Sequence, residues 1–356
     1  MIRITFISKD HIKVKIMKQQ ILVEPGKIKF REIPIPEVKE NEVMIKIICI
    51  GICGSDIHAY HGRHPHTTYP ITQGHEVSGI IEKVGIQITN LKPGDKVTIQ
   101  PQVVCGNCYS CTHGNYHICD ELKVMGFQAT GMASEYFVTD ANRVVKLPCD
   151  MSYEQGAMIE PMAVACGVYS KKDDLNMLNV IVLGAGSIGN LTAQTAKALG
   201  AKSVLITDVS DYRLEIAKRV GVDYTINPLK KNLSEEIVKA FGSDKADLIV
   251  ECVGSNQTID DAIENARKGT DIIIVGVFSD KPVVDLATVQ DRELRLIGTL
   301  MYQTKDYLKA IELIHSGRVH LKPLMSKHFK FEDYDNAYKF IKDKKDKALK
   351  IFIDVS

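Results

Sequence analysis

The sequence predicts an α/β protein of two domains, in which a β-rich, barrel-like unit precedes a doubly wound parallel sheet. Short β-branched segments separated by Pro and Gly turns fill residues 21–147, as in all-β barrels. From residue 179 onward, strand and helix patterns alternate, which is typical of a parallel sheet covered by helices. The length of 356 residues suits about two domains.

The first half of the chain supplies the strands of the β-rich unit. We expect strands at 21–25, 27–33, 42–51, 75–85, 95–101, 134–139 and 143–147. Turns such as Glu24-Pro25-Gly26 separate them. The first clear hairpin begins at Met17, so we expect residues 1–16 to be a dispensable extension.

The second half supplies the helices and the parallel strands. Residues 153–171 have a helical pattern. The expected strands are Asn179–Leu183, Ser203–Thr207, Val222–Ile226, Asp247–Val253, Asp271–Val277 and Leu294–Gly298. A glycine loop and a helix ending at Leu199 follow the first of these strands, and a later helix covers Asp306–Ser316.

Composition narrows the possible partners and the compartment. The net charge of +1 gives no support for nucleic acid or an anionic membrane as a partner. No apolar run approaches the ~18 residues of a membrane span, and charged residues interrupt the N-terminus, unlike a signal peptide. We therefore expect a cytoplasmic protein with reduced thiols.

Four cysteines lie within 15 residues, with the spacing C-x2-C-x2-C-x7-C. They are Cys105, Cys108, Cys111 and Cys119. Four thiolates at short spacing complete a closed tetrahedral shell, which is typical of a structural zinc site. A disulfide framework and an iron–sulfur cluster are the alternatives. Zinc is favoured because a second set of metal-ligand residues and a dinucleotide loop occur in the same chain.

A glycine-rich loop follows the apolar strand NVIVL and opens a helix, as a dinucleotide-binding loop requires. Its residues are Gly184, Ala185, Gly186, Ser187, Ile188 and Gly189. The three glycines allow the tight turn, the approach to a pyrophosphate and close helix–strand packing. Asp208 ends the next strand, where a carboxylate accepts ribose hydroxyls and repels a 2′-phosphate, so we expect NAD rather than NADP. Arg213 is a candidate for stacking on the adenine, although a solvated helix arginine is the commoner case.

A second set of ligand-type residues is mixed in chemistry. Cys53 lies in GICGSDIH, and His75 and Glu76 lie in GHE. A thiolate, an imidazole and a carboxylate suit a catalytic zinc that keeps an open position. Glu160, in IEPMA, is a further carboxylate. Each residue alone is more simply explained as a core or turn residue, but together with the cysteine cluster and the loop they predict a metal site.

These motifs, in this order, resemble the zinc-dependent medium-chain dehydrogenases, specifically the sorbitol/polyol dehydrogenase-like branch. The resemblance covers nearly all of residues 17–356. It implies a GroES-like catalytic domain (17–160 and 303–356, with a structural zinc lobe at about 101–125) and an inserted Rossmann domain (161–302). It also implies a homodimer or homotetramer.

The resemblance also implies roles for individual residues. Cys53, His75 and Glu76 match the catalytic zinc ligands, and Glu160 is expected to bind that metal directly or through its water. Asp56 matches the acid that orients the zinc histidine. Ser55 matches the hydroxyl that relays the substrate proton, and His58 is a candidate for the next step toward solvent.

We therefore expect a zinc- and NAD-dependent oxidation of a secondary alcohol in a polyol, sugar acid or sugar derivative to a ketone. The alternatives are a threonine-dehydrogenase-like amino alcohol oxidoreductase and a protein that binds NAD without turnover. The substrate pocket is not specified by the motifs. Residues expected near it are Phe127, Phe278, Arg295 and Met301.

Overall fold

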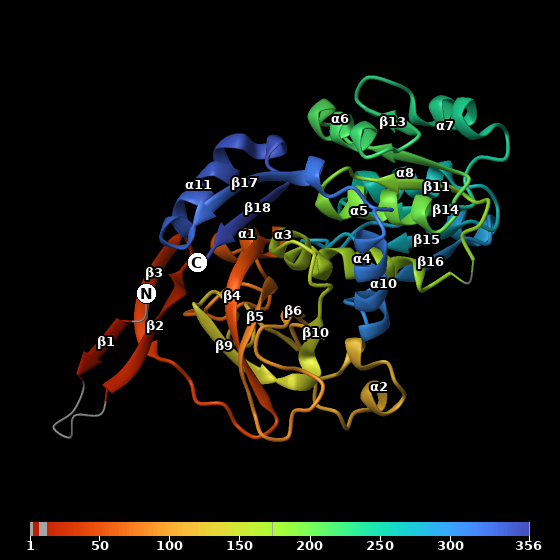
Figure 1. Cartoon of the computed structure of the whole chain (residues 1–356). Coiled ribbons are helices and arrows are strands. Elements are labelled where there is room, and N and C mark those ends of the chain that lie inside the picture. Colours follow the sequence, from red (N-terminus) through yellow and green to blue (C-terminus); the bar gives the residue numbers. More distant parts are fainter. Residues whose placement is uncertain (1–2, 7–12, 173, 356) are drawn as a thin grey trace. The chain divides into compact units, whose positions relative to one another are not determined.

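A computed structural model describes residues 3–6, 13–172 and 174–355 (Figure 1). The chain divides into two compact units. The first unit combines Met1–Glu160 with Met325–Ser356, and the second is Pro161–Leu324. Within the described part of the chain, no helix has both the length and the apolar character needed to span a bilayer.

The first unit is built on a seven-stranded sheet with the order β10-β6-β5-β4-β18-β17, in which β9 also pairs with β4. The strands are β4 (Glu42–Ile52), β5 (Glu76–Val84), β6 (Lys96–Ile99), β9 (Tyr136–Asp140), β10 (Val144–Lys146), β17 (Met325–Lys330) and β18 (Lys350–Asp354). All but the β17–β18 pair are antiparallel. Strands from both ends of the chain therefore share one sheet.

The strand β4 is the hub of this sheet, because it pairs with β5, β9 and β18. Its sequence EVMIKIICIGI supplies apolar side chains that are fully buried, among them Ile45, Ile47 and Ile50. The helix α11 (Tyr334–Lys344) adds the buried rings of Tyr334 and Tyr338 to the same core. Burial of these side chains fixes the register of β4, and so the place where its C-terminal end emerges.

Smaller elements complete the first unit. A three-stranded sheet joins β1 (Arg3–Phe6), β2 (Lys13–Glu24) and β3 (Lys27–Pro34), and a short ribbon joins β7 (Gln102–Val103) to β8 (Lys123–Val124). The strand β2 runs through Met17 without a break, so part of the predicted extension belongs to a strand. The helical elements are α1 (Gly54–Tyr60), α2 (Tyr109–Thr112), η1 (Tyr116–Ile118), η2 (Ala141–Arg143), α3 (Tyr153–Ala157), η4 (Phe331–Asp333) and η5 (Lys345–Lys347).

The second unit is a six-stranded parallel sheet with the order β13-β12-β11-β14-β15-β16. The strands are β11 (Asn179–Leu183), β12 (Ser203–Thr207), β13 (Tyr224–Ile226), β14 (Leu248–Glu251), β15 (Asp271–Ile274) and β16 (Arg295–Gly298). The order reverses between β11 and β14, which is the doubly wound arrangement of dinucleotide-binding folds. The predicted fold class is confirmed.

Helices precede, separate and follow these strands along the chain. They are α4 (Ile159–Tyr169), α5 (Ser187–Ala198), α6 (Asp211–Arg219), α7 (Leu233–Phe241), α8 (Asn256–Asn265), α9 (Leu286–Asp291), α10 (Thr304–His315) and η3 (Lys322–Leu324). Two apolar clusters fill the unit; one includes Val182 and Ala193, the other Leu183 and Ile259. The predicted helix at 153–171 is interrupted at Met158, which ends α3.

The second boundary between the units lies after Leu324, beyond the predicted position at residue 303. Residues 303–324 belong with the parallel sheet for a physical reason. The helix α10 buries Tyr307, Ala310 and Leu313. Further on, the His320 N–H donates to the side chain of Gln194 on α5 at 2.6 Å.

Candidate active site and metal centres

Cys53 occupies the junction between the hub strand and the helix that follows it. It comes directly after β4 and is the N-cap of α1. The carboxylate of Asp56 accepts a hydrogen bond from the Cys53 backbone N–H at 3.0 Å. An acidic residue at this position satisfies a free N–H of the first helical turn and favours the positive end of the helix dipole. The thiol is therefore held on a rigid turn.

His75 and Glu76 reach the same place from the neighbouring strand. Glu76 begins β5, and the antiparallel pairing sets Glu76 opposite Gly51 near the end of β4. Ligand atoms of Cys53, His75 and Glu76 all lie within 4.8 Å of one another. A thiol, an imidazole and a carboxylate at this separation fit the ligand chemistry of a catalytic zinc.

The imidazole of His75 is buried and oriented by Asp56. Its Nδ1 lies 3.5 Å from Asp56 Oδ1, which leaves Nε2 as the ring nitrogen available to a metal. Burial lowers the pKa of His75, but the Asp56 carboxylate and Cys53 outweigh this effect and raise it well above its usual range. An electron-rich histidine paired to a carboxylate is the usual partner of a protein-bound metal.

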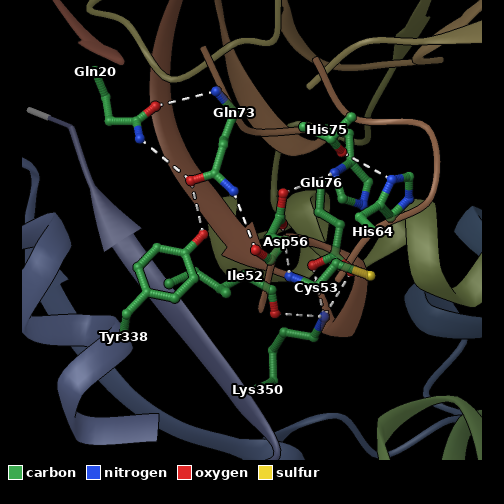
Figure 2. A network of polar contacts seen from close by, with 11 residues as sticks. Gln20, Ile52, Cys53, Asp56, His64, Gln73, His75, Glu76, Tyr338 and Lys350 are labelled. Carbon is green, nitrogen blue, oxygen red and sulfur yellow. Dashed lines mark hydrogen bonds and ion pairs between the residues drawn. The ribbon is translucent and has the colours of Figure 1, made fainter. Parts of the chain in front are cut away.

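A buried lysine contacts this cluster. Lys350, the first residue of β18, places its Nζ 2.7 Å from Oε1 and 2.6 Å from Oε2 of Glu76. Lys350 is 2% exposed and Glu76 is fully buried. Burial lowers the pKa of Lys350, but the negative charges of Glu76, Cys53 and Glu160 outweigh this effect, and the pKa lies above its ordinary value. Figure 2 shows the lysine reaching Glu76 beside Cys53.

A chain of buried amides supports Asp56 from the other side (Figure 2). Gln73 Nε2 donates to the Asp56 backbone carbonyl at 3.2 Å. Its Oε1 accepts from the Tyr338 hydroxyl at 3.0 Å and from Gln20 Nε2 at 3.3 Å. The side chain of Gln20 in turn accepts from the Gln73 N–H at 3.1 Å. The network ties β2, α1 and α11 to the loop that carries His75.

The residues with predicted proton-transfer roles lie on α1. Ser55 is half-buried and His58 is exposed. Three residues apart on a helix, they lie on the same face. Glu160 is buried and close enough to raise the pKa of Lys350, but it is not part of the group of ligand atoms within 4.8 Å.

An aromatic pair lies beside His75. The Phe127 ring is centred 5.1 Å from the His75 ring and stacks on His64 at 4.4 Å. His64 Nδ1 is 2.8 Å from the Thr67 hydroxyl, which fixes the ring. Of the residues expected near the pocket, Phe127 therefore adjoins the metal-ligand cluster. The other three, Phe278, Arg295 and Met301, belong to the second unit.

The four clustered cysteines form a separate site. Their sulfur atoms lie within 4.8 Å of one another, and all four are free thiols rather than disulfides. The Cys119 sulfur lies 3.5 Å from that of Cys105 and 3.9 Å from that of Cys108. A tetrahedral zinc with bonds of about 2.3 Å sets sulfur–sulfur separations of about 3.8 Å, so the arrangement fits this ion.

Backbone groups of this lobe favour the thiolate form at one position. N–H groups of Asp120 and Cys111 lower the pKa of Cys108 to about 7. Burial and the neighbouring Cys108 raise the pKa of Cys111 to about 12. A bound cation stabilises all four thiolates, because each metal–sulfur bond requires deprotonation.

The predicted dinucleotide loop has the geometry that its glycines imply. It joins β11 to α5, with Gly184 in a positive-φ conformation and Gly186 as the N-cap. A Cβ on Gly189 would lie 1.8 Å from the Gly184 carbonyl oxygen, so only glycine fits there. Around Gly186 there is open space, which suits the approach of a phosphate to the helix N-terminus.

Asp208 lies beside this loop. Its carboxylate accepts from the Ala185 N–H and the Ser210 N–H, each at 2.8 Å. The Arg213 guanidinium lies 3.6 Å from the same carboxylate. Two backbone donors thus fix Asp208 next to the phosphate-binding turn, and Arg213 is oriented by Asp208.

Comparison with known proteins identifies the family. A model of the alcohol dehydrogenase GroES-like domain matches residues 39–149, and a zinc-binding dehydrogenase model matches residues 187–316. The chain is 35% identical to sorbitol dehydrogenase 2 of Saccharomyces cerevisiae over 90% of its length and 93% of the yeast protein. The chain belongs to the zinc-dependent medium-chain dehydrogenases, on their sorbitol/polyol branch.

This dehydrogenase is also similar to two further proteins. The chain is 34% identical to 2-dehydro-3-deoxy-L-galactonate 5-dehydrogenase of Pseudoalteromonas atlantica, and the match covers 84% of this chain and 87% of the relative. An alcohol dehydrogenase of Escherichia coli CFT073, crystallised with NADH, superposes with a TM-score of 0.89 at 29% identity. That match covers 96% of this chain and 99% of the other.

The structure brings together Cys53, His75 and Glu76, three of the four residues predicted at the catalytic metal, while Glu160 lies outside this group of ligand atoms. It also brings together the four cysteines predicted for the structural zinc. Sequence reasoning missed Lys350 and the Gln20–Gln73–Tyr338 network. Lys350 is the first residue of β18, KIFID, a position at which an exposed lysine is common, so the local sequence gives no signal for its burial.

Proposed function

We propose that this dehydrogenase oxidises a secondary alcohol of a polyol, sugar acid or sugar derivative to a ketone, with NAD as hydride acceptor. The observation that carries the proposal is the convergence of Cys53, His75 and Glu76 beside Ser55 in a member of the polyol branch. The relatives named for sorbitol and for a deoxy-galactonate derivative support the substrate class.

Cys53, His75 and Glu76 hold the catalytic metal in this proposal, and Glu160 supplies a further carboxylate. Zinc, when bound, supplies a Lewis acid for the substrate oxygen, and NAD supplies the hydride acceptor. Asp56 fixes the orientation of the His75 ring. Cys105, Cys108, Cys111 and Cys119 hold the structural zinc.

Ser55 accepts the proton of the substrate hydroxyl and passes it toward solvent. The hydroxyl group is half-buried on α1, two residues after Cys53, and His58 is exposed on the same face of the helix. A positioned proton acceptor of this kind contributes about 10²–10⁴-fold to the rate.

The glycine loop and Asp208 favour NAD as the cofactor. Gly184, Gly186, Ser187, Ile188 and Gly189 present the helix N-terminus to the pyrophosphate. A carboxylate at the end of β12 accepts ribose hydroxyls and repels a 2′-phosphate. Arg213 borders this part of the site through its ion pair with Asp208.

We further propose that the protein is cytoplasmic and forms a homodimer or homotetramer. All nine cysteines are free thiols, which suits a reducing compartment. Sedimentation of the purified protein measures the oligomeric state, and a monomer overturns that part of the proposal.

The decisive experiment measures NADH formation by the zinc-loaded protein with polyols, aldonates, hexitol phosphates and L-threonine. We expect a polyol or sugar acid to give the strongest signal, and a chelator to abolish it. Activity confined to L-threonine supports an amino alcohol oxidoreductase instead. Retained NADH binding without turnover on any of these compounds supports a non-catalytic NAD-binding protein.

A matched pair of variants tests the proton path. Ser55→Ala removes the proposed proton acceptor, and we expect kcat to fall about 10²-fold or more with little change in zinc content. Ser243→Ala removes the hydroxyl of an exposed serine in the second unit and serves as the control. Equal activity of the Ser55→Ala protein and the wild type rules out the relay.

A further inference from the structure

Lys350 is a cation built into the catalytic metal-ligand cluster. Its Nζ contacts both carboxylate oxygens of Glu76 and lies 3.5 Å from the Ile52 carbonyl oxygen. No solvent separates the pair, because Glu76 is fully buried and Lys350 is 2% exposed. A buried ion pair of this kind is costly to assemble, so its presence at the ligands calls for a functional explanation.

Three strands build the contact. The strand β18 pairs with β4 so that Ile351 lies opposite Ile52, which brings Lys350 to the end of β4 that carries Cys53. Glu76 pairs with Gly51 on the other edge of β4. A Cβ on Gly51 would lie 2.2 Å from Glu76 Oε2, so a glycine in the hub strand makes room for the carboxylate.

The Glu76 carboxylate is therefore shared between the proposed metal and the Lys350 ammonium group. One of its oxygens belongs to the group of ligand atoms within 4.8 Å, together with Cys53 and His75. Both oxygens also accept from Lys350. A carboxylate has about four acceptor sites, so it can bind a metal and the ammonium group together, but each cation weakens the attraction of the other.

We propose that Lys350 is a positioning residue that lowers the affinity of the catalytic site for its metal and keeps the bond to Glu76 labile. The proposal rests on the proposed assignment of Cys53, His75 and Glu76 as metal ligands. Lys350 adds one positive charge to a ligand set with two negative charges, the thiolate and the carboxylate. It holds the two anions together before the metal binds and repels the divalent ion afterwards.

The four-cysteine lobe provides an internal reference for the test. Each molecule carries both metal sites, so a chelator with a chromogenic response extracts zinc from both in one experiment. Metal analysis before and after extraction assigns each kinetic phase. Cys53→Ala removes the catalytic-site phase, and Cys108→Ser removes the lobe phase, which identifies the two.

The test compares Lys350→Met with the wild type by the rate of chelator extraction. We expect the catalytic-site zinc to leave about tenfold more slowly, or slower still, because a repelling charge is gone, while the lobe zinc leaves at an unchanged rate. Lys350→Arg keeps the charge, and we expect it to restore the wild-type rate. Lys347→Met removes an exposed lysine of the same region and serves as the control.

A second comparison keeps the test valid if Lys350→Met leaves Glu76 unpaired and folds poorly. Glu76→Gln with Lys350→Met removes both charges, and it is compared with Glu76→Gln alone. We expect slower zinc release from the double variant. Unchanged or faster release in these comparisons overturns the proposal and leaves Lys350 as a structural anchor. The readout is metal release, so a failed substrate panel does not affect it.

Discussion

The two candidate metal sites of this protein are built in opposite ways. The four-cysteine lobe takes all its ligands from 15 consecutive residues, and they are chemically identical. The Cys53 site takes its ligands from the residue after β4, the residue before β5 and the first residue of β5. It adds a lysine from β18 and support from α1, β2 and α11. The four-cysteine site needs only its own loop to fold. The Cys53 site forms only when strands distant in sequence pair, and residues that do not contact the metal can change its metal affinity.

The largest expected effect separates chemistry from folding. Cys53→Ala removes a ligand of the Cys53 site. We expect turnover to fall on the order of 10³-fold or more, because the metal supplies several kcal/mol of transition-state stabilisation. NADH binding, measured by fluorescence titration, and thermal stability should change little. Cys149→Ala, at an exposed cysteine, is the control. Substantial turnover by Cys53→Ala removes this site from the mechanism.

Loss of a cysteine from the four-cysteine lobe should reduce stability, whereas loss of Cys53 should reduce turnover. Cys108→Ser breaks the four-thiolate shell, and we expect loss of one zinc per chain together with about 3 kcal/mol or more of stability. Metal analysis and thermal melting measure both. Cys149→Ser controls for loss of a thiol. If Cys108→Ser retains normal zinc content and melting temperature, the lobe is not a structural zinc site.

A variant of Asp56 tests whether a residue that contacts a ligand, and not the metal, affects metal binding at the Cys53 site. Asp56→Asn keeps an oxygen for the Cys53 N–H but removes the charge facing His75. We expect about 10–100-fold weaker zinc binding at the catalytic site, and no change at the lobe. Competition with a chelator of known affinity gives both values. Equal loss at the two sites would indicate a general effect on folding instead.

The smallest effect concerns the amide network behind Asp56. Tyr338→Phe removes one buried hydrogen bond to Gln73, and we expect about 1 kcal/mol of destabilisation and a small increase in zinc release from the catalytic site. Tyr60→Phe is a matched control, because Tyr60 stacks on Tyr338 at 4.3 Å but bonds Asp335 instead. Identical zinc release from both variants removes the network from metal positioning.

The same contrast explains what could be predicted from the sequence. The cysteine lobe and the glycine loop are local, so spacing and flanking residues indicate them directly. The parallel strands were predicted from the alternation of strand and helix patterns, and the predicted strands differ from the observed ones only at their ends. The strand predicted from Val222, for example, begins at Tyr224. Cys53, His75 and Glu76 were predicted as a metal site from their ligand chemistry together with the two other motifs, and the resemblance added their roles. The β4–β5 pairing that joins them is not visible in a local pattern.

Lys350 could not be found by local patterns. It contacts a residue 274 positions away, and a lysine at the start of a C-terminal strand looks like an ordinary exposed end. Gln73 and Tyr338 are also separated by 265 positions, and a buried glutamine or tyrosine has no distinctive spacing. Such contacts depend on which strands share a sheet, which is a property of the whole fold.

The separation between Glu76 and Lys350 has a consequence for biosynthesis. Glu76 leaves the ribosome 274 residues before Lys350, which is roughly tens of seconds at ordinary translation rates. During that interval β4 and β5 have no β18 beside them, and the carboxylate has no ammonium partner. In the nascent chain, Cys53, His75 and Glu76 can therefore bind a metal ion before Lys350 has been synthesised. Metal loading during translation and reloading of the finished protein are thus different reactions.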